Sequence, residues 1–193
     1  NGHFQLGNHV FRDSTRGRGY GPVDMHRSIV VSSDVYYYSL AQDMGIDRIH
    51  DFMKPFGFGQ ITGIDLVGEA RGILPSREWK QRRFKQRWAQ GDTISIGIGQ
   101  GYNAFTILQL AHAVATLAND GIVMKPHLVK KIINSKTGEE EIVAKDPVDV
   151  IPLKKENVNF IKRAMQDVTQ KGTGRAIFAG APYTCLLYTS PSP

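Results

Sequence analysis

The amphipathic stretch 107–118 constrains the fold of this 193-residue sequence more than any other feature. Its apolar residues recur at the spacing of one helix face, Thr106 can cap its first turn, and the stop signal 119–121 follows it. The apolar face comprises Ile107, Leu110, Ala111, Val114, Leu117 and Ala118. The sequence therefore predicts a helix over 107–118 whose apolar stripe is buried in a core.

Four further segments show helical spacing. The predicted helices span 24–31, 35–44, 46–56 and 156–171. Asp24 caps the first of them, and the second ends at Gly45. A helix ends readily at glycine, because glycine adopts the left-handed conformation that follows a last turn. We therefore expect a mainly helical chain.

Glycine-rich segments separate the predicted helices. Residues 1–23 and 57–104 are predicted as loops because glycine and polar residues dominate them. Within the second segment, Ile94, Ile96 and Ile98 alternate with small residues, which is typical of a short strand.

The formal charge of +6 is concentrated in the stretch 77–88, where six basic residues alternate with three aromatic ones. Such a stretch can bind single-stranded nucleic acid, but the same composition also occurs in a solvated loop whose aromatic rings pack inward. No nucleic-acid fold signature accompanies the stretch, so we predict no nucleic-acid partner. We expect Lys80, Arg82, Arg83 and Lys85 to be exposed.

The remaining composition excludes several classes of site. Cys185 is the only cysteine, which excludes disulfide frameworks and cysteine-based metal sites. The six histidines show no paired spacing with Asp or Glu, so we predict neither a metal nor a cofactor. The sequence contains no apolar run long enough to span a membrane. Because the chain starts at Asn1, we expect an internal fragment with any anchor upstream.

The tripeptide Ser32-Ser33-Asp34 lies at the break between two predicted helices, where a turn would direct hydroxyl and carboxylate groups into the cleft between them. Serine and aspartate are also favoured helix N-caps. The tripeptide alone therefore supports a capping role as well as a catalytic one.

The surrounding sequence favours the catalytic role, because the chain resembles class B penicillin-binding proteins in order over roughly residues 2–184. The resemblance is carried by Arg27–Tyr38, Phe56–Gly59, Thr62–Leu66, Gly72–Pro75, Gly91–Thr93, Ile96–Tyr102, Leu108–Ala111 and Ala118–Gly121. Asp34 and the stretch 77–81 point to the penicillin-binding protein 2 branch, which serves cell elongation.

This resemblance implies an α/β (α+β) serine transpeptidase fold of the β-lactamase type, of which this chain is mainly the helical lobe with a β-hairpin. It implies a peptidoglycan D,D-transpeptidase that acts through a serine acyl-enzyme. The enzyme class uses Ser-x-x-Lys, a Ser-Asp-Asn-type motif and Lys-Thr-Gly. By resemblance, Ser32 and Asp34 are catalytic: Ser32 joins a proton relay to the leaving amine, and Asp34 holds the lysine or the substrate amide.

Two of the three motifs are missing from the chain. No serine is followed three residues later by lysine, so we expect the nucleophile to lie before Asn1 and this chain to be inactive. Lys136-Thr137-Gly138 matches the third motif in letters, but segments 128–133 and 142–144 flank it, which predicts the tip of a hairpin. We expect the real motif after Ala181–Thr184, where the resemblance ends.

We therefore predict a partial transpeptidase domain over 1–184. Residues 185–193 are predicted as a non-native tail, with an ordinary disordered terminus as the alternative. The implied partners are peptidoglycan stem peptides, β-lactam antibiotics and a cell-elongation glycosyltransferase complex, at the periplasmic face of the bacterial inner membrane. The alternatives are a septal-type class B transpeptidase, a non-catalytic penicillin-recognising sensor domain and a basic binding module.

Overall fold

The computed structural model describes residues 2–15 and 18–181. The chain forms two compact units, and each is described by itself. The first unit combines residues 1–50, 75–103 and 154–193, and the second combines 51–74 and 104–153. The predicted tail, 185–193, lies outside the described residues.

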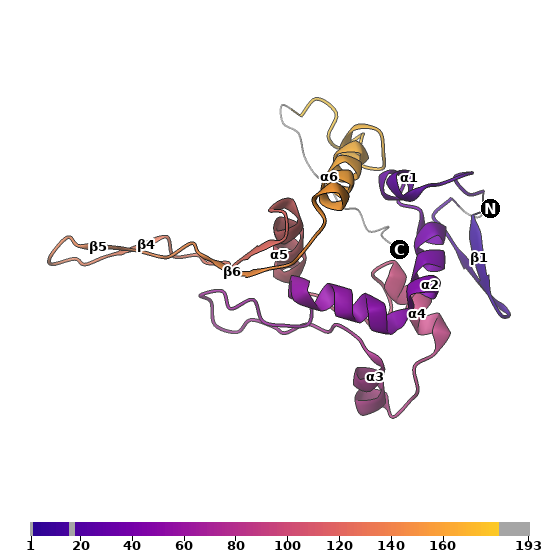
Figure 1. Ribbon diagram of the computed structural model, residues 1–193, viewed down its shortest axis with the longest axis horizontal. Coiled ribbons are helices and arrows are strands. Elements are labelled where there is room, and N and C mark those ends of the chain that lie inside the picture. The colour runs from indigo at the N-terminus through magenta and orange to yellow at the C-terminus, as the bar shows by residue number, and fades with distance from the viewer. Residues whose placement is uncertain (1, 16–17, 182–193) are drawn as a thin grey trace. The chain divides into compact units, whose positions relative to one another are not determined.

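The first unit is mainly helical (Figure 1). Its elements are β1 (His3–Leu6), β2 (His9–Arg12), α1 (Met25–Val30), most of α2 (Asp34–Met53), α3 (Arg77–Phe84), α4 (Gln90–Gly97) and α6 (Lys155–Gln170).

Helices α1 and α2 confirm the predictions for this part of the chain. The Asp24 carboxylate accepts from the backbone N–H of Arg27 at 2.7 Å and so caps α1. Gly45 interrupts α2 with φ 73° and ψ 161°, so the predicted stop at this glycine is a sharp break between two helical halves. The second half continues to Met53.

The loop prediction for residues 1–23 is wrong for β1 and β2, which form an antiparallel hairpin with Phe4 opposite Phe11. Both rings lie against Tyr38 of α2, with centroid separations of 6.1 and 5.3 Å. A two-stranded hairpin is marginal alone, and this packing supplies its support.

The loop prediction for 57–104 is wrong at α3, and the strand prediction at Ile94–Ile98 is wrong because α4 occupies this region. Ile94, Ile96 and Ile98 are all buried. A short helix enclosed on several sides has apolar residues on more than one face. The spacing of its apolar residues alone therefore does not distinguish it from a strand. At Gly97 an added Cβ would lie 2.4 Å from the Cβ of Ala41, so α4 packs closely on α2 only with glycine there.

The core of the first unit gathers Tyr38, Ile94 and Ile98, with partly buried apolar residues of β1, β2 and α2 around them. Helix α6 packs against α1 and confirms the last predicted helix. Its residues Val158, Met165 and Val168 are buried.

The second unit contains the end of α2, a 3₁₀ turn η1 (Lys54–Phe56), α5 (Ile107–Ala118), β3 (Ile122–Met124), β4 (Lys131–Ile133), β5 (Glu140–Ile142) and β6 (Pro147–Val150). Strands β3 and β6 pair antiparallel, as do β4 and β5. Phe56, Ala113, Val123 and Ile151 form its buried core.

Helix α5 has the predicted bounds and the predicted Thr106 cap, but its buried face is not the predicted one. Ile107 is 86% exposed and Leu110 is 44% exposed, whereas Gln109, Ala113 and Thr116 are buried. Hydrogen bonding explains this orientation: the Gln109 side-chain amide donates to the carbonyls of Gln60 and Arg71 at 2.5 and 2.7 Å. A buried amide with good partners outweighs the pattern of apolar residues.

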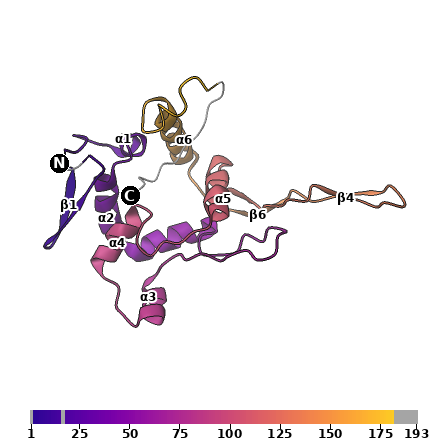
Figure 2. The same ribbon diagram turned by 180° about the vertical axis from the view of Figure 1, so that it is seen from behind.

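The predicted hairpin is confirmed by β4 and β5, which pair Lys131 with Ile142 and Ile133 with Glu140 (Figure 2). Lys136-Thr137-Gly138 forms its exposed turn, where the Asn134 carboxamide oxygen accepts from the backbone N–H groups of Lys136 and Thr137. Lys136-Thr137-Gly138 is therefore part of a turn, as predicted.

The described residues thus form helices with small two-stranded antiparallel pairs, the α+β character expected of a helical lobe. Over residues 2–15 and 18–181, each helix is too short or too polar to cross a bilayer.

Candidate active site

The end of α1 places Ser32 in an unusual backbone conformation. The Ser33 N–H donates to the Ser28 carbonyl at 2.9 Å, and the Ser32 N–H donates to the Ile29 carbonyl at 3.3 Å. This pair of bonds defines a Schellman motif, in which the residue after the C-cap is left-handed and usually glycine. Ser32 occupies that position with φ 55°. A side chain there carries backbone strain, and such strain concentrates at functional sites.

The Ser32 side chain is held by a distant part of the first unit. Ser32 is 8% exposed, and its Oγ lies 3.2 Å from the Oγ1 of Thr173, in the turn after α6. The Thr173 N–H donates to the Val30 carbonyl at 3.3 Å. The site therefore joins two segments that are 141 residues apart in sequence.

Asp34 opens α2 and is buried, with 6% of its surface exposed. Its Oδ1 accepts no hydrogen bond from any described residue. Burial, together with the charge of Asp13, raises the pKa of Asp34 to about 6. The burial of Tyr38, together with the charges of Asp34 and Asp13, raises the pKa of Tyr38 to about 12. A carboxylate in this environment favours a cationic or hydrogen-bond-donating partner.

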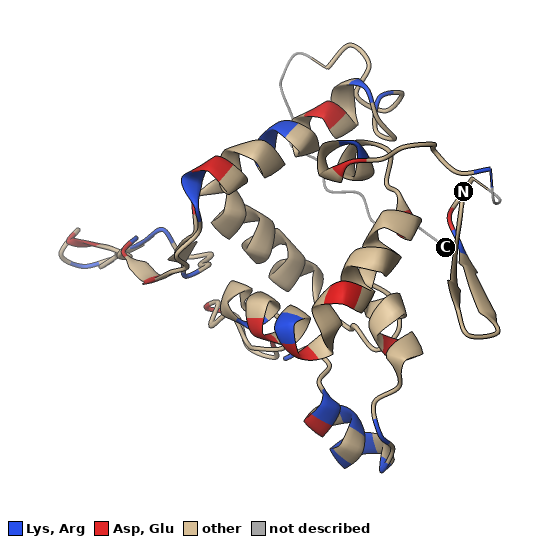
Figure 3. Cartoon of the chain, turned by 45° about the vertical axis from the view of Figure 1, so that its right-hand side comes forward, with Lys and Arg blue, Asp and Glu red and all other residues tan. Residues whose placement is uncertain are grey.

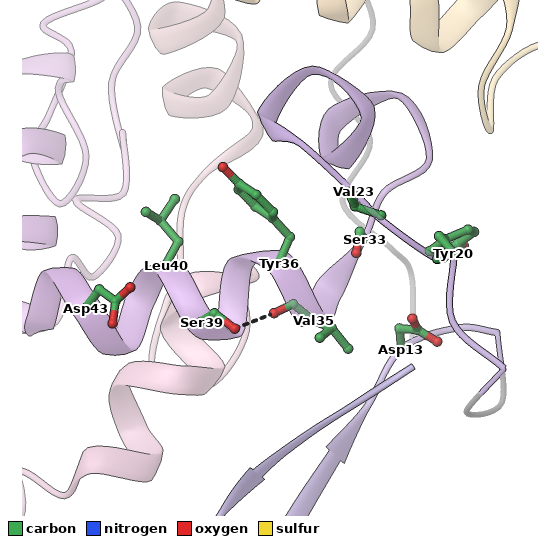
Figure 4. Close-up of a pocket in the computed structure, with 10 residues that line it drawn as sticks. Asp13, Tyr20, Val23, Ser33, Val35, Tyr36, Ser39, Leu40 and Asp43 are labelled. Atoms are coloured by element: carbon green, nitrogen blue, oxygen red, sulfur yellow. Dashed lines mark hydrogen bonds between the residues drawn. The ribbon is translucent and has the colours of Figure 1, made fainter. Parts of the chain in front are cut away.

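A pocket of about 350 Å³ opens beside the start of α2. Asp13, Tyr20, Ser33, Tyr36 and Asp43 are among its lining residues (Figure 4). The Asp13 carboxylate accepts from the Thr15 N–H at 2.9 Å, which orients it. The pocket is thus lined by both polar and apolar side chains and adjoins the middle residue of the tripeptide; its lining includes neither Ser32 nor Asp34.

The basic stretch 77–88 differs from its prediction at Lys80. Arg82, Arg83 and Lys85 are exposed on and after α3 as expected, and Figure 3 shows the cluster of basic residues there. Lys80, by contrast, is 4% exposed, so the prediction of an exposed lysine is wrong. Its Nζ lies 2.5 Å from the Asp92 carboxylate and 5.3 Å from the centre of the Tyr102 ring. The bond to Asp92 raises the pKa of Lys80, so it stays charged and links α3 to α4.

Metal coordination has little support in the described part of the chain, where no three His, Cys, Asp or Glu side chains cluster as ligands would. Thr173, Gly172 and Asp13 were not among the predicted site residues. The first two were visible only as a Gly-Thr-Gly turn after a helix, and Asp13 carried no local signal at all.

Known proteins resemble this chain over most of its length. The family described as "Penicillin binding protein transpeptidase domain" matches residues 2–185. The chain belongs to this family. The predicted family and fold class are therefore confirmed.

Individual relatives are similar over nearly the whole chain. The peptidoglycan D,D-transpeptidase MrdA of Haemophilus influenzae is 45% identical over 178 residues, which is 90% of this chain and 27% of that protein. The MrdA of Escherichia coli K12 is 42% identical over 167 residues, 86% of this chain and 26% of that protein. The crystal structure of Pseudomonas aeruginosa penicillin-binding protein 2 in complex with WCK 5153 is 40% identical with a TM-score of 0.83, covering 95% of this chain and 40% of that one. The chain thus spans about a quarter of the length of these curated relatives.

Proposed function

We propose that residues 1–184 are part of a peptidoglycan D,D-transpeptidase and that Ser32 and Asp34 belong to its active site. In this proposal a segment outside the chain supplies the nucleophile, because the sequence contains no Ser-x-x-Lys. The observation that carries the proposal is the buried Asp34 carboxylate, whose Oδ1 accepts no bond from a described residue, two positions from the strained Ser32.

A buried acceptor without a partner costs about 1–3 kcal/mol, so an additional donor next to Asp34 stabilises the site. A lysine ammonium offers three donors and a positive charge. The lysine of Ser-x-x-Lys meets both requirements, and Asp34 would in turn favour its protonated form.

The proposed chemistry is acyl transfer. The neutral amine of the Ser-x-x-Lys lysine takes the proton of the serine, whose oxygen attacks the carbonyl of the D-Ala–D-Ala bond. The resulting ammonium, which Asp34 stabilises, returns a proton to Ser32 as the Ser32 hydroxyl donates its own to the nitrogen of the departing D-Ala. The C–N bond breaks and leaves the acyl-enzyme. A β-lactam reacts with the same serine, which makes fluorescent penicillin a suitable probe.

The relatives support the penicillin-binding protein 2 branch over a septal type. Identity is 40% to the Pseudomonas protein of that name, but 26% to a Mycobacterium penicillin-binding protein 3. One neighbouring structure, 30% identical, is a complex of penicillin-binding protein 2 with MreC from Helicobacter pylori. We accordingly propose an anchored protein at the periplasmic face of the inner membrane, working with a cell-elongation complex.

A chimera tests the proposal. In this chimera residues 1–184 replace the matching segment of the Haemophilus relative, and it is incubated with fluorescent penicillin beside the 193-residue chain. We expect a covalent label on the chimera, none on the chain alone, and a loss of about 10²–10⁴-fold in labelling rate for Ser32→Ala at unchanged melting temperature. A label on the chain alone, or normal labelling of Ser32→Ala, would overturn the proposal. A folded chimera that takes no label favours the sensor alternative.

A further inference from the structure

The turn after α6 lies directly against the end of α1. The Gly172 N–H donates to the Asp167 carbonyl at 3.0 Å, and the Gly174 N–H donates to the Val168 carbonyl at 3.1 Å, so the turn is fixed to its own helix. The Thr173 N–H points the other way and donates to the Val30 carbonyl. The same three residues are thus bonded to both helices.

Gly172 makes this approach possible. A Cβ added there would lie 2.1 Å from the Val30 carbonyl oxygen and 3.0 Å from the Val30 carbonyl carbon, both of which are backbone atoms. Backbone cannot move aside as a side chain can, so a larger residue would push the turn away from α1.

Helix α6 itself is held to α1 at a second place. The His26 Nε2 lies 3.3 Å from the Asp167 carboxylate, and the His26 ring meets Phe160 edge-on at 5.9 Å. Two attachment points fix both the position and the rotation of α6, so the direction of Thr173 is fixed as well.

From this geometry we infer that Thr173 is a positioning residue for Ser32, and that Gly172 lets it approach. The inference rests on the proposed function. A serine hydroxyl rotates freely unless a partner holds it, and it has one proton and two acceptor sites. Threonine is branched at Cβ and has few rotamers, so its hydroxyl is a rigid partner. Either hydroxyl can donate across this 3.2 Å contact. In the orientation that the inference requires, Thr173 donates to the Ser32 Oγ, so the Ser32 proton is directed away from Thr173 and is available to the leaving amine.

The test measures the acylation rate of the chimera with fluorescent penicillin. Thr173→Val keeps the shape and removes the hydroxyl, and we expect it to slow acylation about 10- to 100-fold, as misplacement of a reacting group does. Thr173→Ser restores the hydroxyl and should recover the rate to within a few-fold, while Gly172→Ala should slow acylation as Thr173→Val does. The melting temperature of Thr173→Val should match that of the unmodified chimera.

A double-mutant cycle separates positioning from a merely structural role. If Thr173 acts through Ser32, Ser32→Ala with Thr173→Val should be no slower than Ser32→Ala alone. The inference would be overturned if the two substitutions reduced the acylation rate multiplicatively, or if Thr173→Val acylated at the unmodified rate. Either result would overturn it even where Ser32→Ala alone acylates slowly. A normal rate for Ser32→Ala would overturn the proposed function instead. If the folded chimera takes no label, the proposed function is overturned, and the inference that rests on it is overturned with it.

Discussion

Asp13 and Asp34 are two buried carboxylates of the first unit, and the charge of Asp13 raises the pKa of Asp34 beyond the effect of burial. They come from different segments, one after β2 and one at the first turn of α2. Like charges in a poorly solvated place oppose ionisation, so the folded chain holds the Asp34 proton more tightly than the unfolded chain does.

The first prediction is a loss of stability as the pH rises. The pKa of Asp34 is about 6 in the folded chain against 3.8 as its ordinary value, so its contribution is fully present below pH 3.8 and is lost as the pH rises through 6. In the 193-residue chain, Asp34→Asn removes this dependence. The melting temperature of Asp34→Asn minus that of the unmodified chain should therefore grow between pH 4.5 and pH 7.5 in thermal scans. Asp13→Asn is the matched control and should give a smaller rise. Parallel curves for Asp34→Asn and the unmodified chain would contradict the prediction.

The second prediction follows from the left-handed backbone of Ser32. Glycine adopts this conformation freely, whereas alanine is strained there by about 1 kcal/mol. Both substitutions remove the hydroxyl, so Ser32→Gly should be more stable than Ser32→Ala by that amount in urea denaturation. Ser33 is the matched control, because it is not among the positive-φ residues, and there alanine should be the more stable. Neither Ser32 variant should restore acylation in the chimera. Equal stabilities of the two Ser32 variants would argue against the strained turn.

The third prediction concerns the buried ion pair of Lys80 and Asp92. Lys80→Met should destabilise the chain by about 3 kcal/mol, because the Asp92 carboxylate, 17% exposed, loses its cation. Adding Asp92→Asn removes the uncompensated charge and should recover part of the loss. Arg82→Met on the same helix is exposed and should change stability by less than about 0.5 kcal/mol. Similar losses for Lys80→Met and Arg82→Met would show that the pair contributes nothing.

The sequence was sufficient where local chemistry decides the structure. Thr106 caps α5, Gly45 breaks α2 and Asn134 organises the β4–β5 turn, and each acts on residues within a few positions of itself. These features depend on backbone groups close in sequence, so pattern and propensity find them.

The sequence did not predict features that depend on contacts between residues far apart in the chain. Ser32 stands at a position that favours glycine, and only its neighbours in the folded chain keep it there. Lys80 resembles its exposed neighbours until Asp92 and Tyr102 enclose it. Thr173 shows its connection to Ser32 only in three dimensions. Places where local rules fail are often functional, which is the case proposed for Ser32.

The last prediction concerns the exposed apolar side of α5. Ile107 and Leu110 lie on the surface here, although the sequence analysis expected their stripe to be buried, and Gln109 directs the opposite side into the second unit. The resemblance implies that the main sheet of the transpeptidase comes from segments outside this chain, which leaves faces of the helical lobe bare. If the sheet covers this stripe, the same substitution should have two different effects.

In the 193-residue chain, Leu110→Ala should cost less than about 1 kcal/mol, because a half-exposed side chain loses little burial. In the chimera it should cost about 2–5 kcal/mol, as truncation of a buried leucine does. Gln109→Ala is the control: it leaves the Gln60 and Arg71 carbonyls without their donor and should destabilise both proteins alike. Urea denaturation of the four variants measures the difference. An equally small effect of Leu110→Ala in both would mean that the stripe stays on the surface of the complete domain, and its apolar residues would then need an explanation other than the sheet.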